Sequence, residues 1–373
     1  MKIIYGLFIL LLFSCCNTDS SENMVQENYV DYLNVIETIY SIADEMDMKV
    51  ISDLNFSGGN LYPSANSTKI IQEACSYCEN FYGQFGHHPS FWGWYLNNEI
   101  NPIKNDDYAQ TRFWRNIWKQ VTTKCHSVFP EGKVTISPFV ILDSEERRGF
   151  EYLLPEEYEE WWYNTLIETD IDIVMLQDSG AEHLSFFSLE LREPFLQAFY
   201  NACKRANKDL WVNVESAHVK ASDWDEALSM EWNKNKQWEF VGIDWLRKKL
   251  ELAAMYGSRI VNWGYFPMMN PVEMLSGMTV EDIDNQYVDC SSRLENYNLY
   301  KDYIQNLSES ESKLEDYLTL PKIDGTLWYL AGNKYQLTNE KLVEAIRKDI
   351  ENQKNAGFSI LWLVNTSAYF QKK

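Results

Sequence analysis

Apolar and polar positions follow two different patterns along most of this chain. Segments such as 29–46, 68–85 and 189–206 carry apolar residues at intervals of three and four, which predicts amphipathic helices. Between these segments lie short and nearly continuous apolar runs, of which Phe91–Leu96 and Leu210–Glu215 are the clearest. Strands that are buried on both faces have this composition. The pattern therefore predicts helices that alternate with buried strands.

The alternation extends through eight strand-like runs. Strands are expected at 49–56, 91–96, 133–139, 171–178, 210–215, 259–266, 324–330 and 357–365. Alternating strands and helices favour a parallel sheet with crossover helices, and eight such units close a (β/α)8 barrel. We therefore predict an α/β fold of the TIM-barrel type.

No long Gly-, Ser- or Pro-rich linker divides the chain, so we predict a single catalytic-type domain over residues 24–373. Residues 24–270 are expected to supply six of the strands. Residues 271–373 are expected to supply the last helix and the two remaining strands. The segments 218–240 and 267–285 are expected to border a cleft.

The N-terminus has the pattern of a targeting segment. Lys2 precedes an apolar stretch, Ile3–Phe13, that is too short to span a bilayer comfortably. Ser14 and Cys15 follow it, and this arrangement resembles a bacterial lipoprotein signal. We expect residues 1–23 to be a signal peptide and short tether, with Cys15 as the lipidated residue. Cys16 and an ordinary secretory signal are the alternatives.

A lipidated Cys15 implies an extracytoplasmic protein, periplasmic or at the cell surface, that is attached to a bacterial membrane through its lipid alone. Asp and Glu outnumber Lys and Arg by 55 to 33, which gives a formal net charge of −22. Because nucleic-acid binding needs basic surface, the charge argues against a nucleic-acid partner. The 14 Trp and 23 Tyr residues predict a wide aromatic core, with a few side chains left to line a cleft where sugars stack.

Five cysteines follow the N-terminal segment, and an odd number forms no complete disulfide framework. Cys75 and Cys78 have CxxC spacing, but no second CxxC or histidine pair completes a zinc site. We therefore expect no metal. The protein is also expected to need no cofactor and to be a monomer.

Two glutamates stand where predicted strands end. Glu99 follows the run Phe91–Leu96 and the pair Asn97-Asn98, and Glu215 closes the run that begins at Leu210. Catalytic residues of TIM barrels come from the C-terminal ends of different strands, and a glycosidic bond is cleaved by a pair of carboxyl groups. The pair therefore indicates an enzyme that acts on a sugar. The alternative is that both are solvated loop carboxylates.

Several short motifs, taken in order, resemble the DUF4434 family, a bacterial group of glycoside-hydrolase-like TIM barrels. The motifs are Gly86–Tyr95 with Asn98-Glu99, Ile136–Pro138, Asp172–Val174 with Gln177-Asp178, and Leu210-Trp211 with Val214-Glu215. The resemblance covers roughly residues 25 to 270, which correspond to strands three to eight of the family pattern.

The family pattern normally begins with a strand of the Gly-Thr-Phe-Trp type. Here the similar segments, Ile323–Trp328 and Ala356–Trp362, lie at the C-terminal end. This departure predicts a circularly permuted barrel whose strands one and two come from the C-terminal region. The alternative is a fragment of a tandem repeat. Both predict that residues 325–365 pair beside residues 49–56.

The resemblance implies roles for both glutamates, because in the family's strand order Glu99 ends strand four and Glu215 ends strand seven. This is similar to the retaining glycosidase clan, in which the first would be the acid/base and the second the nucleophile. Further candidates for substrate contact are Asn98, Asp178, Trp94, Asn213, His218, Trp263 and Tyr265. Trp94 could instead fill the barrel. His87 and His88 are expected at the opposite barrel end, in a capping or packing role.

We therefore expect a lipid-anchored, retaining glycoside hydrolase of carbohydrate metabolism whose substrate is an extracytoplasmic glycan. The alternative is a carbohydrate-binding lipoprotein without catalytic activity on the same scaffold. Fold alone does not confer function, so the two differ in what the strand-end carboxylates do.

Overall fold

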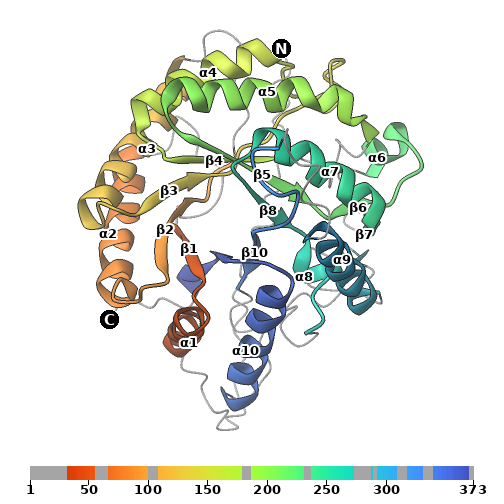
Figure 1. Ribbon diagram of the computed structural model, residues 1–373. Coiled ribbons are helices and arrows are strands. Elements are labelled where there is room, and N and C mark those ends of the chain that lie inside the picture. Colours follow the sequence, from red (N-terminus) through yellow and green to blue (C-terminus); the bar gives the residue numbers. More distant parts are fainter. Residues whose placement is uncertain are drawn as a thin grey trace, which may run out of the picture.

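The computed structural model of the chain describes residues 32–54, 66–99, 108–178, 186–230, 237–272, 287–288, 292–308, 317–330 and 339–368 (Figure 1). The expected signal segment, with Cys15 and Cys16, lies outside these residues, and so does most of 267–285.

Eight parallel strands form a closed barrel, which confirms the predicted fold class. The strands are β1 (Lys49–Leu54), β2 (Phe91–Leu96), β3 (Lys133–Ile136), β4 (Ile173–Gln177), β5 (Asp209–Glu215), β8 (Arg259–Trp263), β10 (Gly325–Tyr329) and β11 (Ile360–Val364). Their order around the barrel is β1-β11-β10-β8-β5-β4-β3-β2. Each of the eight predicted strands is present, and most of them end earlier than the apolar pattern suggested.

The C-terminal strands close the barrel within this one chain. β11 pairs in parallel with β1, with Lys49 opposite Ile360 and Ser52 opposite Leu363. β10 pairs with β11 on one side and with β8 on the other, where Gly325 lies opposite Val261. The strand β11 therefore lies beside β1 and β10 lies beside β11, as the permuted arrangement predicts.

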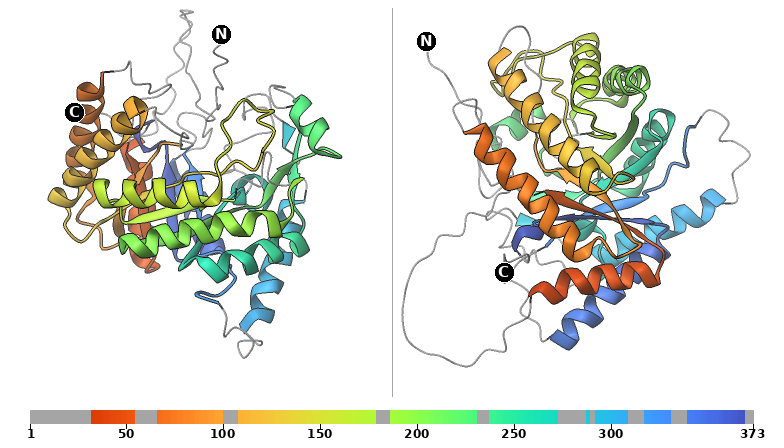
Figure 2. Two further views of the ribbon diagram at one scale, coloured as in Figure 1. Left: turned by 90° about the horizontal axis from the view of Figure 1, so that it is seen from above. Right: turned by 90° about the vertical axis from the view of Figure 1, so that its left-hand side faces the viewer.

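Helices surround the barrel (Figure 1). They are α1 (Tyr32–Glu45), α2 (Ser67–Phe85), α3 (Tyr108–Val128), α4 (Pro155–Thr169), α5 (Leu189–Ala206), α7 (Ile243–Tyr256), α9 (Arg293–Ser308) and α10 (Asn339–Asn355). Figure 2 shows α1 and α10 side by side, and the ion pair between Arg347 and Glu45 at 2.7 Å joins them. Among the described helices, none combines the length and the apolar character that a membrane span requires.

The segment 218–240, which was expected to border a cleft, contains regular structure in its described residues. β6 (Ala217–Val219), α6 (Trp224–Met230) and β7 (Gln237–Phe240) lie there, and β7 also pairs with β9 (Tyr287–Val288). Two short helical turns, α8 (Tyr265–Met268) and η5 (Thr366–Ala368), follow β8 and β11. The small sheet β6-β7-β9 is therefore an addition to the barrel that begins directly after β5.

Apolar side chains form two separate layers. One fills the barrel and consists of Ile51, Tyr95, Ile173, Met175, Trp211, Val261, Ile360, Trp362 and Val364, with Trp92 stacked on Trp211. The other lies between the strands and the surrounding helices and holds large aromatic residues such as Tyr40, Phe81, Trp118 and Trp162. Most of the aromatic residues therefore serve packing.

The described cysteines Cys75, Cys78, Cys125 and Cys203 are free thiols.

Candidate active site

Glu99 is held from across the barrel edge by Gln177. Gln177 is the last residue of β4 and follows Ile173 and Met175 on the face that points into the barrel. Its amide nitrogen donates to Oε1 of Glu99 at 2.9 Å and to the carbonyl oxygen of Ser137 at 2.9 Å. The carboxylate of Glu99 is therefore directed over β3 toward β4.

Asn213 and Glu215 share the inward face of β5 with Trp211, which lies in the barrel core. Asn213 lies opposite Gln177 in the β4–β5 register. Its Nδ2 is 3.4 Å from the hydroxyl of Ser137, and its buried Oδ1 has no hydrogen-bond partner among the described residues. Glu215 is 6% exposed. Glu99, Gln177, Asn213 and Glu215 thus lie on one stretch of the C-terminal barrel edge.

Asp178 faces the helices and not the barrel mouth. It comes directly after the inward-facing Gln177, and its carboxylate accepts the backbone N–H of Glu215 at 3.2 Å. The other oxygen lies 2.8 Å from Nζ of Lys249 on α7 and 3.8 Å from the guanidinium of Arg192 on α5. The predicted contact with substrate is therefore replaced by a role in fixing the end of β5.

Lys249 is the cation nearest to this strand end. It is 3% exposed and donates to the carbonyl oxygen of Glu215 as well as to Asp178. Burial lowers the pKa of Lys249, and Asp178 opposes that effect. Burial likewise lowers the pKa of Arg192, while Asp178 and Glu215 act to raise it. Because such interactions are mutual, the two cations favour the ionised form of Glu215.

Trp263 and His218 lie next to Glu215. Trp263 ends β8 opposite Glu215 in the register, and its ring meets Trp238 of β7 edge-on at 5.7 Å. His218 on β6 pairs with Glu239 of β7, with Nε2 3.3 Å from the carboxylate. Burial lowers the pKa of His218, and nearby Lys249 adds to that effect. Both predicted residues therefore remain candidates for the edge of a substrate cleft.

Two other predicted residues lie away from the barrel mouth. Trp94 is fully buried and packs edge-on against Phe81 and Phe91 in the layer between barrel and helices. Tyr265 is 1% exposed, packs edge-on against Phe358, and has a pKa raised well above its usual value by burial. Neither side chain can reach a sugar, so their prediction as substrate contacts is wrong.

Asn98 is also directed outward. It is mostly buried, and its amide oxygen accepts the indole N–H of Trp118 on α3 at 3.1 Å. This bond ties the segment after β2 to the helix layer. Asn98 therefore supports the position of Glu99, and the predicted hydrogen bond to a sugar hydroxyl is not favoured by its orientation.

The sequence interpretation did not identify three residues that position the C-terminal barrel edge, namely Gln177, Lys249 and Asp53. Asp53 is the next-to-last residue of β1 and lies on the same inward face as Ile51, and burial raises its pKa. It accepts the backbone N–H groups of Asn365 and Thr366 at 3.0 Å each, which fastens β1 to the end of β11. Strand alternation could have identified Asp53 and Gln177, and a lysine within the apolar stripe of Leu246, Leu250 and Ala253 could have identified Lys249.

A family model described as a domain of unknown function, DUF4434, matches residues 7–274. This match includes every strand from β1 to β8, and therefore both Glu99 and Glu215. The strands β10 and β11 lie beyond it. No curated protein matches the chain.

Three solved structures are similar in fold at low identity. A candidate α-L-fucosidase from Bacteroides thetaiotaomicron is 14% identical, with a TM-score of 0.44 over 76% of this chain and 91% of that one. A psychrophilic glycoside hydrolase family 10 endo-β-1,4-xylanase is 10% identical, with a TM-score of 0.31 over 53% and 64%. An α-amylase from Malbranchea cinnamomea is 8% identical, with a TM-score of 0.38 over 88% and 70%.

Proposed function

The chain belongs to the DUF4434 family, and we propose that it is a retaining glycoside hydrolase in which Glu99 is the acid/base and Glu215 the nucleophile. The observation that carries this proposal is the bond from Gln177 to Glu99. It holds one carboxylate over the strand that neighbours β5, where the second carboxylate lies on the inward face. Two carboxyl groups at the C-terminal edge of a barrel are what glycosidic hydrolysis requires.

In the first step, the carboxylate of Glu215 attacks the anomeric carbon while protonated Glu99 gives its proton to the leaving oxygen. The C–O bond to the leaving group breaks, and a glycosyl ester with Glu215 forms. In the second step, Glu99 takes a proton from water, which attacks the same carbon and releases Glu215. A separation of about 5–5.5 Å between the carboxyl groups suits this double displacement.

The surroundings of Glu215 fit its proposed role. Lys249 and Arg192 lie close enough to Glu215 for its charge to raise their pKa values, and they favour the carboxylate that a nucleophile needs. The unpartnered Oδ1 of Asn213 is a ready acceptor for a sugar hydroxyl beside the reacting carbon. Trp263 offers an aromatic surface next to Glu215 on which a sugar face can stack.

The proposed substrate is a glycan outside the cytoplasm, because the N-terminal sequence resembles a lipoprotein signal with Cys15 as the lipidation site. In this proposal the protein acts as a monomer, with a lipid anchor as its one attachment to the membrane and with no nucleic-acid partner. Radiolabelled palmitate tests the anchor, since Cys15→Ser removes the label if Cys15 carries the lipid.

The chemistry is tested with Glu99→Gln and Glu215→Gln on a panel of aryl glycosides and polysaccharides. Each variant is expected to lose about 10³-fold or more of the turnover, and proton NMR of the first product should show the anomer of the substrate. Glu79→Gln is the control, because Glu79 is an exposed glutamate that pairs with Lys124 on the helix surface. Full activity in Glu215→Gln would remove the mechanism. Sugar binding that survives in both variants, without turnover in the wild type, would identify a carbohydrate-binding protein.

A further inference from the structure

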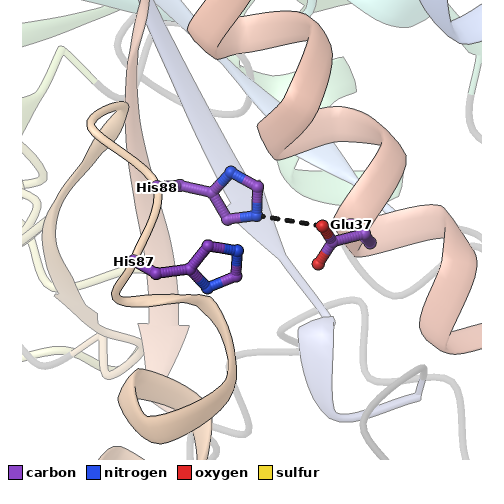
Figure 3. Close-up of side chains that lie close together, drawn as sticks. All are labelled: Glu37, His87 and His88. Carbon is purple, nitrogen blue, oxygen red and sulfur yellow. Dashed lines mark ion pairs between the residues drawn. The ribbon is translucent and has the colours of Figure 1, made fainter.

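A second cluster of ligand-type side chains lies at the other end of the barrel. Glu37 of α1 and the adjacent His87 and His88, which precede β2, bring one potential ligand atom each to within 4.8 Å of the others (Figure 3). Because β2 begins at Phe91, this cluster lies at the N-terminal end of the strands, opposite Glu99. The sequence interpretation expected packing roles for both histidines and no metal.

His88 is buried and held in one orientation. It is 7% exposed, and its Nδ1 lies 2.6 Å from Oδ2 of Asp44, whose other oxygen accepts the N–H of Ser90 at 2.9 Å. The ring also stacks on Tyr40. Since a carboxylate accepts hydrogen bonds, Nδ1 is the donor in this contact, and Nε2 is the ring nitrogen left to bind a ligand. That Nε2 is buried, has no hydrogen-bond partner among the described residues, and lies 3.3 Å from Oε1 of Glu37.

His87 has the same tautomer for a similar reason. Its Nδ1 is 3.0 Å from the backbone carbonyl of Gln84, and a carbonyl oxygen can only accept. Its Nε2 is therefore the ring nitrogen left to bind a ligand. The two imidazole rings lie 4.1 Å apart, and Figure 3 shows one ring nitrogen of each directed toward Glu37. Both Nε2 atoms thus face the same carboxylate.

We propose that Glu37, His87 and His88 bind a divalent transition-metal cation, with zinc as the best match. Two imidazole nitrogens and one carboxylate oxygen are ligands that zinc takes, and a water fills the fourth position in such sites. Zinc–ligand bonds of about 2.0–2.1 Å in a tetrahedron place neighbouring ligand atoms about 3.4 Å apart. The 3.3 Å between His88 Nε2 and Glu37 Oε1 fits that spacing.

Asp44 completes the site without touching the metal. Metal-bound histidines typically donate their other N–H to a carboxylate or a carbonyl, which fixes the ring and raises its basicity as a ligand. His88 has a carboxylate in this position and His87 has a carbonyl. The competing explanation is a doubly protonated His88 that forms ion pairs with both Asp44 and Glu37, and it requires no contribution from His87.

The site would join α1 to the turn before β2. Since this is the face of a TIM barrel that supports stability and not catalysis, the bound metal is expected to stabilise the fold. A ligand that binds the folded chain better than the unfolded chain raises the melting temperature. This role is independent of the glycosidase proposal, because the two clusters lie at opposite ends of the strands.

The test is a zinc titration of the full chain after treatment with a chelator, followed by calorimetry and by thermal melting. The wild type should bind one zinc ion at this cluster and melt at a higher temperature with it. Glu37→Gln and His87→Ala each remove one ligand from a solvent-accessible position, and each should weaken binding about tenfold or more. The matched control is His126→Ala, because His126 also faces two carboxylates, but Asp170 lies 3.5 Å from its Nδ1 and Asp172 lies 2.9 Å from its Nε2, so the two do not converge on one ring nitrogen.

Cobalt(II) in place of zinc reports the ligand type. Nitrogen and oxygen ligands give visible ligand-field bands without the thiolate charge-transfer band that cysteine ligation would add. The site would be supported if the wild type shows the ligand-field bands without the thiolate band, and if the ligand-field bands disappear in His87→Ala. The proposal is overturned if the wild type binds no zinc, if all variants bind it equally well, or if the thiolate band appears. Each of the last two results would place the metal elsewhere.

Discussion

Gln177 reaches from the end of β4 across β3 and donates to Oε1 of Glu99 at 2.9 Å, although 78 residues separate the two along the chain. The same amide nitrogen also donates to the carbonyl oxygen of Ser137 on the intervening segment. A side chain with both bonds in place has little freedom, so Gln177 holds Glu99 in one orientation. In the proposed mechanism this orients the acid/base before substrate binds, and such preorganisation contributes to enzymatic rate enhancement.

Gln177→Ala should therefore reduce kcat/KM about 10–100-fold, because Glu99 loses its orientation. The lost N–H also stabilised the ionised form of Glu99, so its removal should raise the pKa of that carboxyl. The basic limb of the pH profile, which reports the acid that must stay protonated, should move to higher pH. Gln197→Ala is the control, since Gln197 donates to Asn201 on α5. An unchanged pH profile in an impaired Gln177→Ala would assign Gln177 a purely structural role.

Asp178→Asn should destabilise the fold strongly. The substitution keeps the shape of the side chain but removes the negative charge 2.8 Å from Lys249 and 3.8 Å from Arg192, both of which are buried. A buried cation that loses its partner costs about 3–5 kcal/mol. The free energy of unfolding in urea measures the effect.

The matched control for Asp178→Asn is Asp225→Asn, which breaks the exposed pair with Arg147 at 2.7 Å. Exposed pairs contribute about 0–1 kcal/mol, so this variant should unfold almost like the wild type. Equal losses of unfolding free energy in the two variants would show that burial does not determine how much the ion pairs of Asp178 contribute to stability.

The barrel could be predicted from sequence because each strand is a continuous apolar run, but such runs do not reveal which face points inward. In Phe91–Leu96 every side chain except Gly93 is a large apolar one. The register between β1 and β2 shifts at Val50/Ile51, and as a result Val50 lies opposite Phe91 and Ile51 lies opposite Gly93. Trp92 consequently stacks inside the barrel while Trp94 packs outside it.

Two other features depend on geometry that no local pattern carries. Gly264 adopts a φ of +106°, which ends β8 at Trp263 and turns Tyr265 into the outer layer. The cluster of Glu37, His87 and His88 joins two segments that are separated by 50 residues or so and meet because β1 pairs with β2. Spacing rules detect ligands within one segment, so they do not point to this cluster.

Asp349 on α10 should make stability fall as the pH rises. Burial raises the pKa of Asp349 to about 7, from an ordinary value of 3.8. The folded chain therefore keeps a proton that the unfolded chain releases between these values, so the stabilisation is complete below about pH 4 and is lost as the pH rises to about 7. The difference is on the order of 4 kcal/mol.

Asp349→Asn should remove this dependence. Urea unfolding at pH 5 and pH 8 should find the variant clearly more stable than the wild type at pH 8, with a smaller difference at pH 5. The amide also keeps an oxygen for the hydrogen bond from Gln353. Glu351→Gln, on the exposed side of the same helix, serves as the control. A wild type whose stability matches that of Asp349→Asn at both pH values would contradict the raised pKa.

Gly325→Ala tests the closure of the barrel by its C-terminal strands. A Cβ at this position would lie 2.5 Å from the carbonyl oxygen of Ile360 and 2.7 Å from its Cβ, which is closer than any real contact. The added methyl must push β10 away from β11, and overpacking of this kind costs about 1–3 kcal/mol. The opposite sign is expected for Gly83→Ala in α2, where nothing lies within 4 Å and helix propensity favours alanine by about 0.5–1 kcal/mol. Urea midpoints that do not separate the two variants would mean that β10 and β11 do not pair within this chain, and the permuted barrel would then have to be abandoned.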